Sequence, residues 1–353
     1  MTRICGRRGG WAALLFVLAA GFLPAKAPAQ PTETAPAALV ARIPPRSPQA
    51  LSGSAFVARV MGKSGAEREL AIRDEMLAGN IPPFLRQLRR VELSCCDGKT
   101  RPSHAGVWVM PDYLAIGSDE DFVRFPASFD TASVVARAFG FVLPTTAIVD
   151  AIYRQAQLRL APLTMNPTQA MTSTAYFAEH DRQIRAQMLQ LSPHPLGELA
   201  AGHKKDYVLT NRLAQAQSQE AIYGWHRAID APIQPLSLVH GARYADYSHG
   251  VRLVSETVFV DGVPSSFYEL LEREPEAELL SREGAIKSAR RLMEPQPAAR
   301  PAPTICSSES PGGSSGDSAD RAPGCRANTE PASGRHPHGP GSGRKRTNSP
   351  SSP

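Results

Sequence analysis

Cysteine is scarce in this chain, with five in 353 residues, and the five are poorly placed for pairing or for metal binding. Cys5 lies near the N-terminus, Cys306 and Cys325 lie in a tail rich in proline and serine, and Cys95 and Cys96 are neighbours. Adjacent residues of a strand point to opposite faces, so the last two are not expected to act together. The pattern excludes a disulfide-rich scaffold and a zinc site of closely spaced cysteines.

The body of the chain also lacks a strong excess of charge. The formal net charge is +6, but much of the basicity belongs to the two ends, in Arg3, Arg7, Arg8, Arg335, Arg344, Lys345 and Arg346. The central part is therefore closer to neutral, and we expect no nucleic-acid partner.

The N-terminus predicts a secretory signal peptide. Its arginines precede the apolar run WAALLFVLAAGFL, and Ala27-Pro28-Ala29 follows as a small-residue cleavage pattern. The run is shorter than the roughly 20 apolar residues that cross a bilayer. We expect residues 1–29 to be removed, leaving a secreted or periplasmic protein with no stable membrane span.

Composition divides the rest into three segments. Residues 30–60 are rich in proline, alanine and serine, which predicts a flexible lead-in. Residues 294–353 combine proline, glycine, serine and charge without periodic apolar positions, which predicts a disordered tail. Residues 61–293 are enough for one globular domain.

The periodicity predicts an α+β fold with a mostly antiparallel sheet and several packing helices. We expect helices over 65–77, 130–139, 145–156, 172–191 and 265–284, and strands over 90–96, 106–110, 206–210, 221–226, 232–240 and 250–262. Asp97-Gly98 predicts a hairpin turn between the first two strands. Strands followed by helices and then by strands favour this class over a doubly wound sheet.

The start of the first helix is marked by Ser64 and Glu67, which have the spacing of a capping box. Gly62-Lys63-Ser64 resembles the end of a phosphate-binding loop. Val57 stands where that motif requires glycine, so we discard this interpretation.

Candidate site residues gather near the ends of the later strands. Strand ends meet at the rim of a sheet, where loops commonly place catalytic groups. The segment HGARYADYSHGVRLV, residues 240–254, is the densest part of this region. The candidate catalytic residues are His249, Asp246, His240, Arg252, Asp206 and His203.

Three roles are open for them. His249 can act as a general base, oriented by Asp246 or Asp206, while Arg252 stabilises an anion. His240, Asp246 and His249 can instead bind a divalent metal and leave a position for water; the cofactor is otherwise unknown. In the third role Asp246 caps a loop, His249 bonds a backbone group and the neighbouring tyrosines pack.

Ser248-His249-Gly250-Val251-Arg252-Leu253 resembles the Ser-His-Gly-Cys-x-Arg signature of L,D-transpeptidases, which cross-link bacterial cell walls. His240-Gly241 resembles the upstream His-Gly of that family. The nucleophilic cysteine of the family would fall at or before Val251 and is absent, so no thioester intermediate can form. The resemblance implies a cell-wall substrate and chemistry without a thiol.

The strings DYLAIGSDEDFVRFP, FVLPTTAIVDAIY, AGHKKDYVLTNRL, IYGWH and YADYSHGVRLV are similar to those of a family of secreted bacterial proteins without an established activity. This similarity covers about residues 65–285. It implies export and one continuous domain, and it implies no mechanism.

These observations predict an exported hydrolase or transferase acting on cell-wall or extracellular carbohydrate or peptide, with peptidoglycan or a glycan as the expected partner. The alternative is a non-catalytic envelope or glycan-binding module that stacks sugars on Trp225, Tyr223, Tyr244 and Tyr247. The sequence leaves open whether the protein is an enzyme.

Overall fold

The computed structural model describes residues 35–94, 104–191 and 196–295. They belong to one compact unit with the predicted α+β fold. The predicted signal peptide, the Asp97-Gly98 turn and nearly all of the predicted tail lie outside the described residues. Among the helices that are described, none has the length and apolarity to cross a membrane.

The larger sheet is antiparallel and contains the predicted hairpin. Its order is β1 (Arg89–Ser94), β2 (His104–Val109), β12 (Val254–Val260) and β13 (Val263–Ser266), and β5 (Phe141–Val142) also pairs with β12. Val91 pairs with Val107 across the hairpin, and both side chains are fully buried. The hairpin therefore presents an apolar face to the core, as its β-branched residues predict.

The second sheet carries two of the candidate site residues, Asp206 and His249. Its order is β10 (Ala231–Ser237), β9 (Ile222–Ala228), β8 (Lys205–Tyr207) and β11 (His249–Gly250), and β11 is parallel to β8. Two short pairs complete the strands: β3 (Ile116–Gly117) with β4 (Phe122–Val123), and β6 (Leu158–Arg159) with β7 (Ala200–Ala201).

The single strand predicted over 250–262 is divided between the two sheets. His249 and Gly250 pair with β8, whereas β12 begins at Val254 and pairs with β2. Between them the backbone carbonyls of Val251 and Leu253 accept hydrogen bonds from Leu114 and Met110. The chain thus changes partners at this point, and the extended sequence pattern of residues 250–262 does not reveal such a change.

The helices are α1 (Ala37–Val40), α2 (Gly53–Val60), α3 (Gly65–Leu77), α4 (Phe129–Phe139), α5 (Thr146–Gln155), α6 (Thr174–Gln190), α7 (Phe267–Glu272) and α8 (Ala289–Leu292), with short 3₁₀ turns η1 (Pro83–Arg86), η2 (Gln169–Thr172), η3 (Asn211–Gln215) and η4 (Glu276–Leu279). The capping box at Ser64 and Glu67 is present at the start of α3. The helix predicted over 265–284 is shorter: α7 ends at Glu272, two residues before Glu274-Pro275, because proline cannot continue a helix.

The prediction of a flexible lead-in over 30–60 is wrong for its described part. Residues 53–60 form α2, where Phe56 and Val60 are fully buried, and Ile43 is 4 % exposed. The segment alternates proline with apolar residues, and the apolar side chains fill the core against β3, β4 and α6. Tertiary burial here outweighs a composition typical of linkers.

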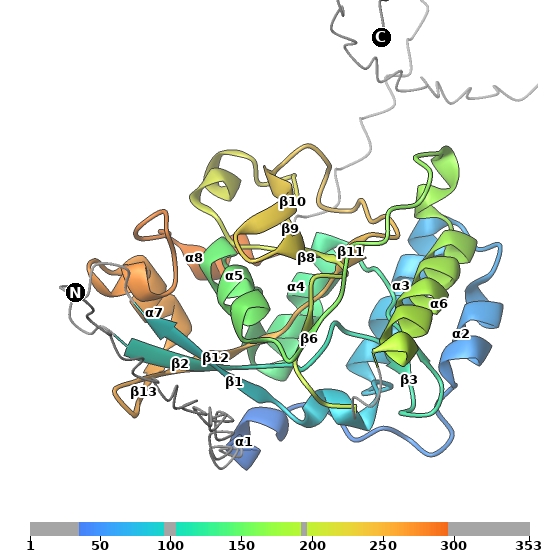
Figure 1. The fold of residues 1–353 in the computed structure, drawn as a ribbon, viewed down its shortest axis with the longest axis horizontal. Helices are drawn as coiled ribbons and strands as arrows, with labels where there is room; N and C mark the ends of the chain where they lie inside the picture. The colour runs from blue at the N-terminus through green and yellow to red at the C-terminus, as the bar shows by residue number, and fades with distance from the viewer. Residues whose placement is uncertain (1–34, 95–103, 192–195, 296–353) are drawn as a thin grey trace, which may run out of the picture. The chain divides into compact units, whose positions relative to one another are not determined.

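Helix α5 contacts both sheets, through β1 on one side and β9 on the other (Figure 1). Helices α2 and α6 lie side by side at one end of the fold, and α7 covers β12 and β13 at the other. The inner strands β8 and β11 of the second sheet are largely buried, including the polar residues Asp206 and His249, whereas the edge strand β10 is partly exposed.

Candidate functional site

His249 is fully buried at the start of β11, in register with Lys205 of β8. Its Nδ1 atom lies 3.1 Å from the Tyr207 hydroxyl and accepts a hydrogen bond from the backbone N–H of Asp246 at 3.4 Å. Because Nδ1 is the acceptor, the neutral ring carries its proton on Nε2. Burial lowers the pKa of His249 to about 4, so the ring is neutral at pH 7.

Glu220 faces the other nitrogen of this ring, and the sequence reasoning missed it. Its carboxyl group is fully buried just before β9, and Oε1 lies 3.6 Å from Nε2 of His249. Among the described residues, neither oxygen of Glu220 nor the Nε2 atom has a hydrogen-bond partner. The available signal in the sequence was an acidic residue directly before the apolar run AIYGW.

The surroundings of Glu220 favour its protonated form. Burial and then the negative charge of Asp246 raise its pKa to about 9, although the neighbouring Tyr207 hydroxyl acts in the opposite direction. The group is therefore a neutral carboxylic acid at pH 7. An acid held in this state has a proton to donate.

Asp246 approaches the same imidazole from the loop before β11. Its Oδ2 atom lies 3.8 Å from Nε2 of His249 and accepts a hydrogen bond from the Tyr244 hydroxyl at 3.3 Å. Its Oδ1 atom accepts from the backbone N–H and the hydroxyl of Ser248, at 2.8 and 2.6 Å. Burial opposes ionisation, but His249 and Ser248 outweigh it and hold the pKa of Asp246 below its usual range. The loop-capping role expected of Asp246 is observed.

His240 lies outside this group of three. It is half-buried, and its ring stacks on Tyr244 with centroids 4.1 Å apart and planes at 19°. Metal binding by His240, Asp246 and His249 stays a prediction. In the described part of the chain, no three His, Cys, Asp or Glu side chains are arranged to hold a metal ion.

Asp206 points away from His249, so the prediction that it orients this histidine is wrong. Successive residues of a strand project to opposite faces, and Tyr207 of β8 takes the face of His249. Asp206 instead accepts a hydrogen bond from the Tyr113 hydroxyl at 2.9 Å. Burial raises its pKa to about 6.

Arg252 and His203 belong with Asp206 to a separate buried cluster. Arg252 donates hydrogen bonds to the carbonyls of Met110 and Ala200, at 2.9 and 2.6 Å. His203 lies with Nε2 3.0 Å from Asp112. The structure therefore uses Arg252 to join chain segments, and the role predicted for it, stabilising an anion beside His249, is wrong.

Two aromatic residues of the alternative sugar-binding surface are buried. Trp225 is 6 % exposed and Tyr247 is 3 % exposed, whereas Tyr223 and Tyr244 are half-buried. Tyr223 donates to Asp150 at 3.0 Å, and the same carboxylate accepts from Nε2 of His226 at 2.9 Å. Trp225 and Tyr247 therefore pack inside the fold, and only Tyr223 and Tyr244 are partly exposed.

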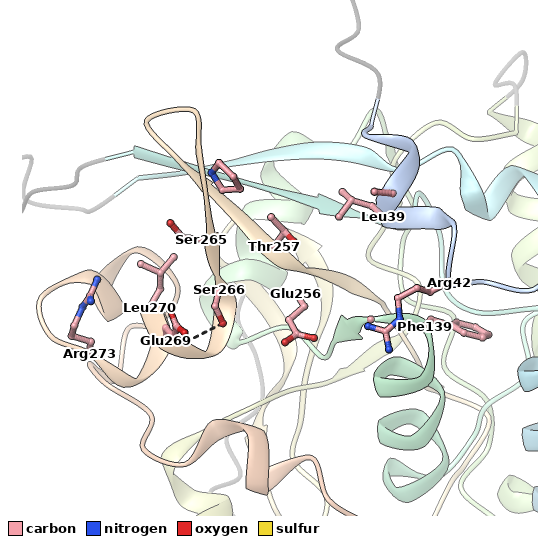
Figure 2. Close-up of a pocket in the computed structure, with 13 residues that line it drawn as sticks. Leu39, Arg42, Phe139, Glu256, Thr257, Ser265, Ser266, Glu269, Leu270 and Arg273 are labelled. Atoms are coloured by element: carbon pink, nitrogen blue, oxygen red, sulfur yellow. Dashed lines mark hydrogen bonds between the residues drawn. The ribbon is translucent and has the colours of Figure 1, made fainter.

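Two of the surface pockets differ in their position: one reaches the loop of the candidate site and the other does not. A pocket of about 690 Å³ lies between α1, the end of α4, the β12–β13 hairpin and α7, and Figure 2 shows Arg42, Glu256 and Arg273 in its wall. None of the predicted site residues lines it. A pocket of about 410 Å³ includes Tyr244 and Ala245 in its wall, so it reaches the loop that holds Asp246.

Comparison with protein-family models, with curated proteins and with solved structures found no match to this chain. Function must therefore be inferred from the residues of the site.

Proposed function

We propose that this chain is an exported hydrolase or transferase of cell-wall or extracellular carbohydrate or peptide, with an acid–base centre formed by Glu220, Asp246 and His249. The observation that carries the proposal is the contact between Glu220 and His249. Two buried polar groups face each other at 3.6 Å, and among the described residues neither has a hydrogen-bond partner at the facing atoms. Buried groups left unpaired cost stability, and catalytic use is one reason for keeping them.

The two carboxyl groups have the properties of an acid and a base. Glu220 is protonated at neutral pH, whereas Asp246 is ionised. Two carboxyl groups whose pKa values are moved apart by their surroundings are typical of acid–base catalysis. Glu220 would donate its proton to the leaving oxygen or nitrogen, and Asp246 would accept a proton from the attacking water or hydroxyl. The Nε2–H of His249 would then stabilise the Glu220 carboxylate.

Access to this centre would run through Tyr244. Its hydroxyl contacts Asp246, and its side chain is half-buried in the wall of the 410 Å³ pocket. A substrate in this pocket would therefore approach the centre from the side of Asp246. The predicted export signal and the resemblance to the Ser-His-Gly-Cys-x-Arg signature support a cell-wall substrate.

The test is digestion of purified peptidoglycan by the exported protein, with new reducing ends and new amino groups measured separately. Reducing ends report cleavage of glycosidic bonds, and amino groups report cleavage of peptide bonds. We expect Glu220→Gln and Asp246→Asn to abolish the release. Asp150→Asn is the matched control, because it alters a buried carboxylate outside the centre. Full activity of both site variants would contradict the proposal.

A further inference from the structure

The 410 Å³ pocket has a wall rich in positive charge. It is formed by the start of α3, the end of η2 and the loop that contains Tyr244, and it is lined by Lys63, Gly65, Arg68, Glu69, Thr172, Ser173, Arg243, Tyr244 and Ala245. The lining residues include three cationic side chains and one carboxylate, and one of the cations, Arg243, is paired with Asp130 at 3.4 Å. We name it the Arg68 pocket.

Arg68 is the unusual member of this wall. It is 6 % exposed, and its Nε atom has no hydrogen-bond partner among the described residues. One long hydrogen bond of 3.4 Å joins its Nη1 atom to Thr174, and its guanidinium lies 4.5 Å from the ring centroid of Phe177. Within the described chain no carboxylate forms a salt bridge with it. A buried cation without a paired anion is costly, and a bound anion would offset this cost.

The backbone adds positive potential at the same place. Gly65 is the first residue of the 13-residue helix α3, so the positive end of the helix dipole lies at the pocket wall. Helix N-termini attract anions through this dipole and through backbone N–H groups. The 690 Å³ pocket has no comparable feature: none of its lining residues has a buried polar side-chain atom without a partner, and Glu256 is paired with Arg290 at 2.6 Å.

We infer that the Arg68 pocket binds the free carboxylate of a peptide substrate that is processed at the Glu220, Asp246 and His249 centre. This inference rests on the proposed function. The Glu69 carboxylate in the same wall favours a singly charged group, because it repels a doubly charged phosphate about twice as strongly. Tyr244 is shared by the pocket and the centre, so a peptide anchored here would lie next to Asp246.

The test is calorimetric titration of the full exported chain with N-acetyl-alanyl-alanine as the free acid, as the C-terminal amide, and with inorganic phosphate. We expect the free acid to bind at least tenfold more tightly than the amide, and Arg68→Gln to remove this preference. Arg73→Gln is the control, because Arg73 lies on α3 but pairs with Asp74 outside this pocket. Equal binding of acid and amide, or tighter binding of phosphate, overturns the inference.

Two further measurements keep the outcome unambiguous. If Arg68→Gln does not fold, Lys63→Gln replaces it, because Lys63 is exposed. We expect this variant to lose part of the preference for the free acid over the amide. An unchanged preference would count against the pocket. Glu220→Gln should bind the free acid as the unaltered protein does. If the protein prefers the free acid and Glu220→Gln remains active, the proposed function is wrong and the anion-binding pocket is retained. If Glu220→Gln is inactive and the protein does not prefer the free acid, the pocket is wrong and the proposed function is retained.

Discussion

The Nε2 atom of His249 lies 3.6 Å from Oε1 of Glu220. The two residues are 29 positions apart: His249 begins β11, and Glu220 lies two residues before β9 of the same sheet. Both groups are fully buried, and Asp246 stands 3.8 Å from the same nitrogen. The proposed enzyme depends on this contact, and four predictions test it and the fold that surrounds it.

Replacing the histidine should reduce activity strongly. We expect His249→Ala to lower peptidoglycan turnover by about 100-fold or more, as loss of a hydrogen-bond donor that stabilises a charge formed during the reaction typically does. Release of reducing ends and of amino groups is the measurement. His226→Gln is the control, since His226 is a buried histidine that pairs with Asp150. Equal losses in the two variants would point to a structural role for His249.

Glu220 should make stability depend on pH. Its pKa is raised to about 9 in the folded protein from an ordinary 4.5, so its stabilising effect is complete below pH 4.5 and is lost as the pH rises through 9. The unfolding equilibrium constant of the unaltered protein, divided by that of Glu220→Gln, should rise by up to about tenfold per pH unit between pH 7 and 9. Urea unfolding of the unaltered protein and of Glu220→Gln across this window measures it.

The comparison between the two proteins is essential, because Lys204 acts in the opposite direction. Burial lowers its pKa to about 7 from 10.5, so its contribution to stability grows as the pH rises. His249 has its effect below pH 6.5 and does not interfere. Identical pH profiles for the unaltered protein and Glu220→Gln would show that Glu220 is not held in its neutral form.

The buried ion pair between Asp112 and Arg124 should be costly to break. Its atoms are 2.6 Å apart, and both side chains are at most 3 % exposed. Asp112→Ala leaves the Arg124 charge with Asp181 alone, and we expect a loss of about 3–5 kcal/mol in the free energy of unfolding. Glu179→Ala removes a surface pair with Arg182 and should cost less than about 1 kcal/mol. Chemical denaturation compares the two.

Helix α2 should contribute to stability like any other part of the core. We expect Phe56→Ala to cost about 3–5 kcal/mol, because the side chain is fully buried against Phe125 at 5.1 Å between ring centroids. Met61→Ala, at a side chain that is 49 % exposed, should change stability by less than about 0.5 kcal/mol. Similar thermal melting of both variants would restore the interpretation of residues 30–60 as a flexible lead-in.

Much of the local structure could be predicted because it depends on neighbouring residues. The capping box at Ser64 and Glu67 defines the start of α3, and the β-branched residues around Val91 and Val107 form the predicted hairpin. The candidate site was predicted in part: His249 and Asp246 are three residues apart and meet. Glu220 was missed, because its partner lies far along the chain and no local pattern connects them.

The sequence by itself determined the fold class, most helix positions and the segment in which the candidate chemistry lies, since periodicity, caps and composition act over a few residues. The tertiary structure alone decided which polar residues face one another. Pairing of β11 with β8 placed the His249 ring against the Tyr207 hydroxyl, and the alternation along β8 turned Asp206 to the other side. Long-range pairing sets these relationships, and burial then sets the protonation states that the proposed chemistry needs.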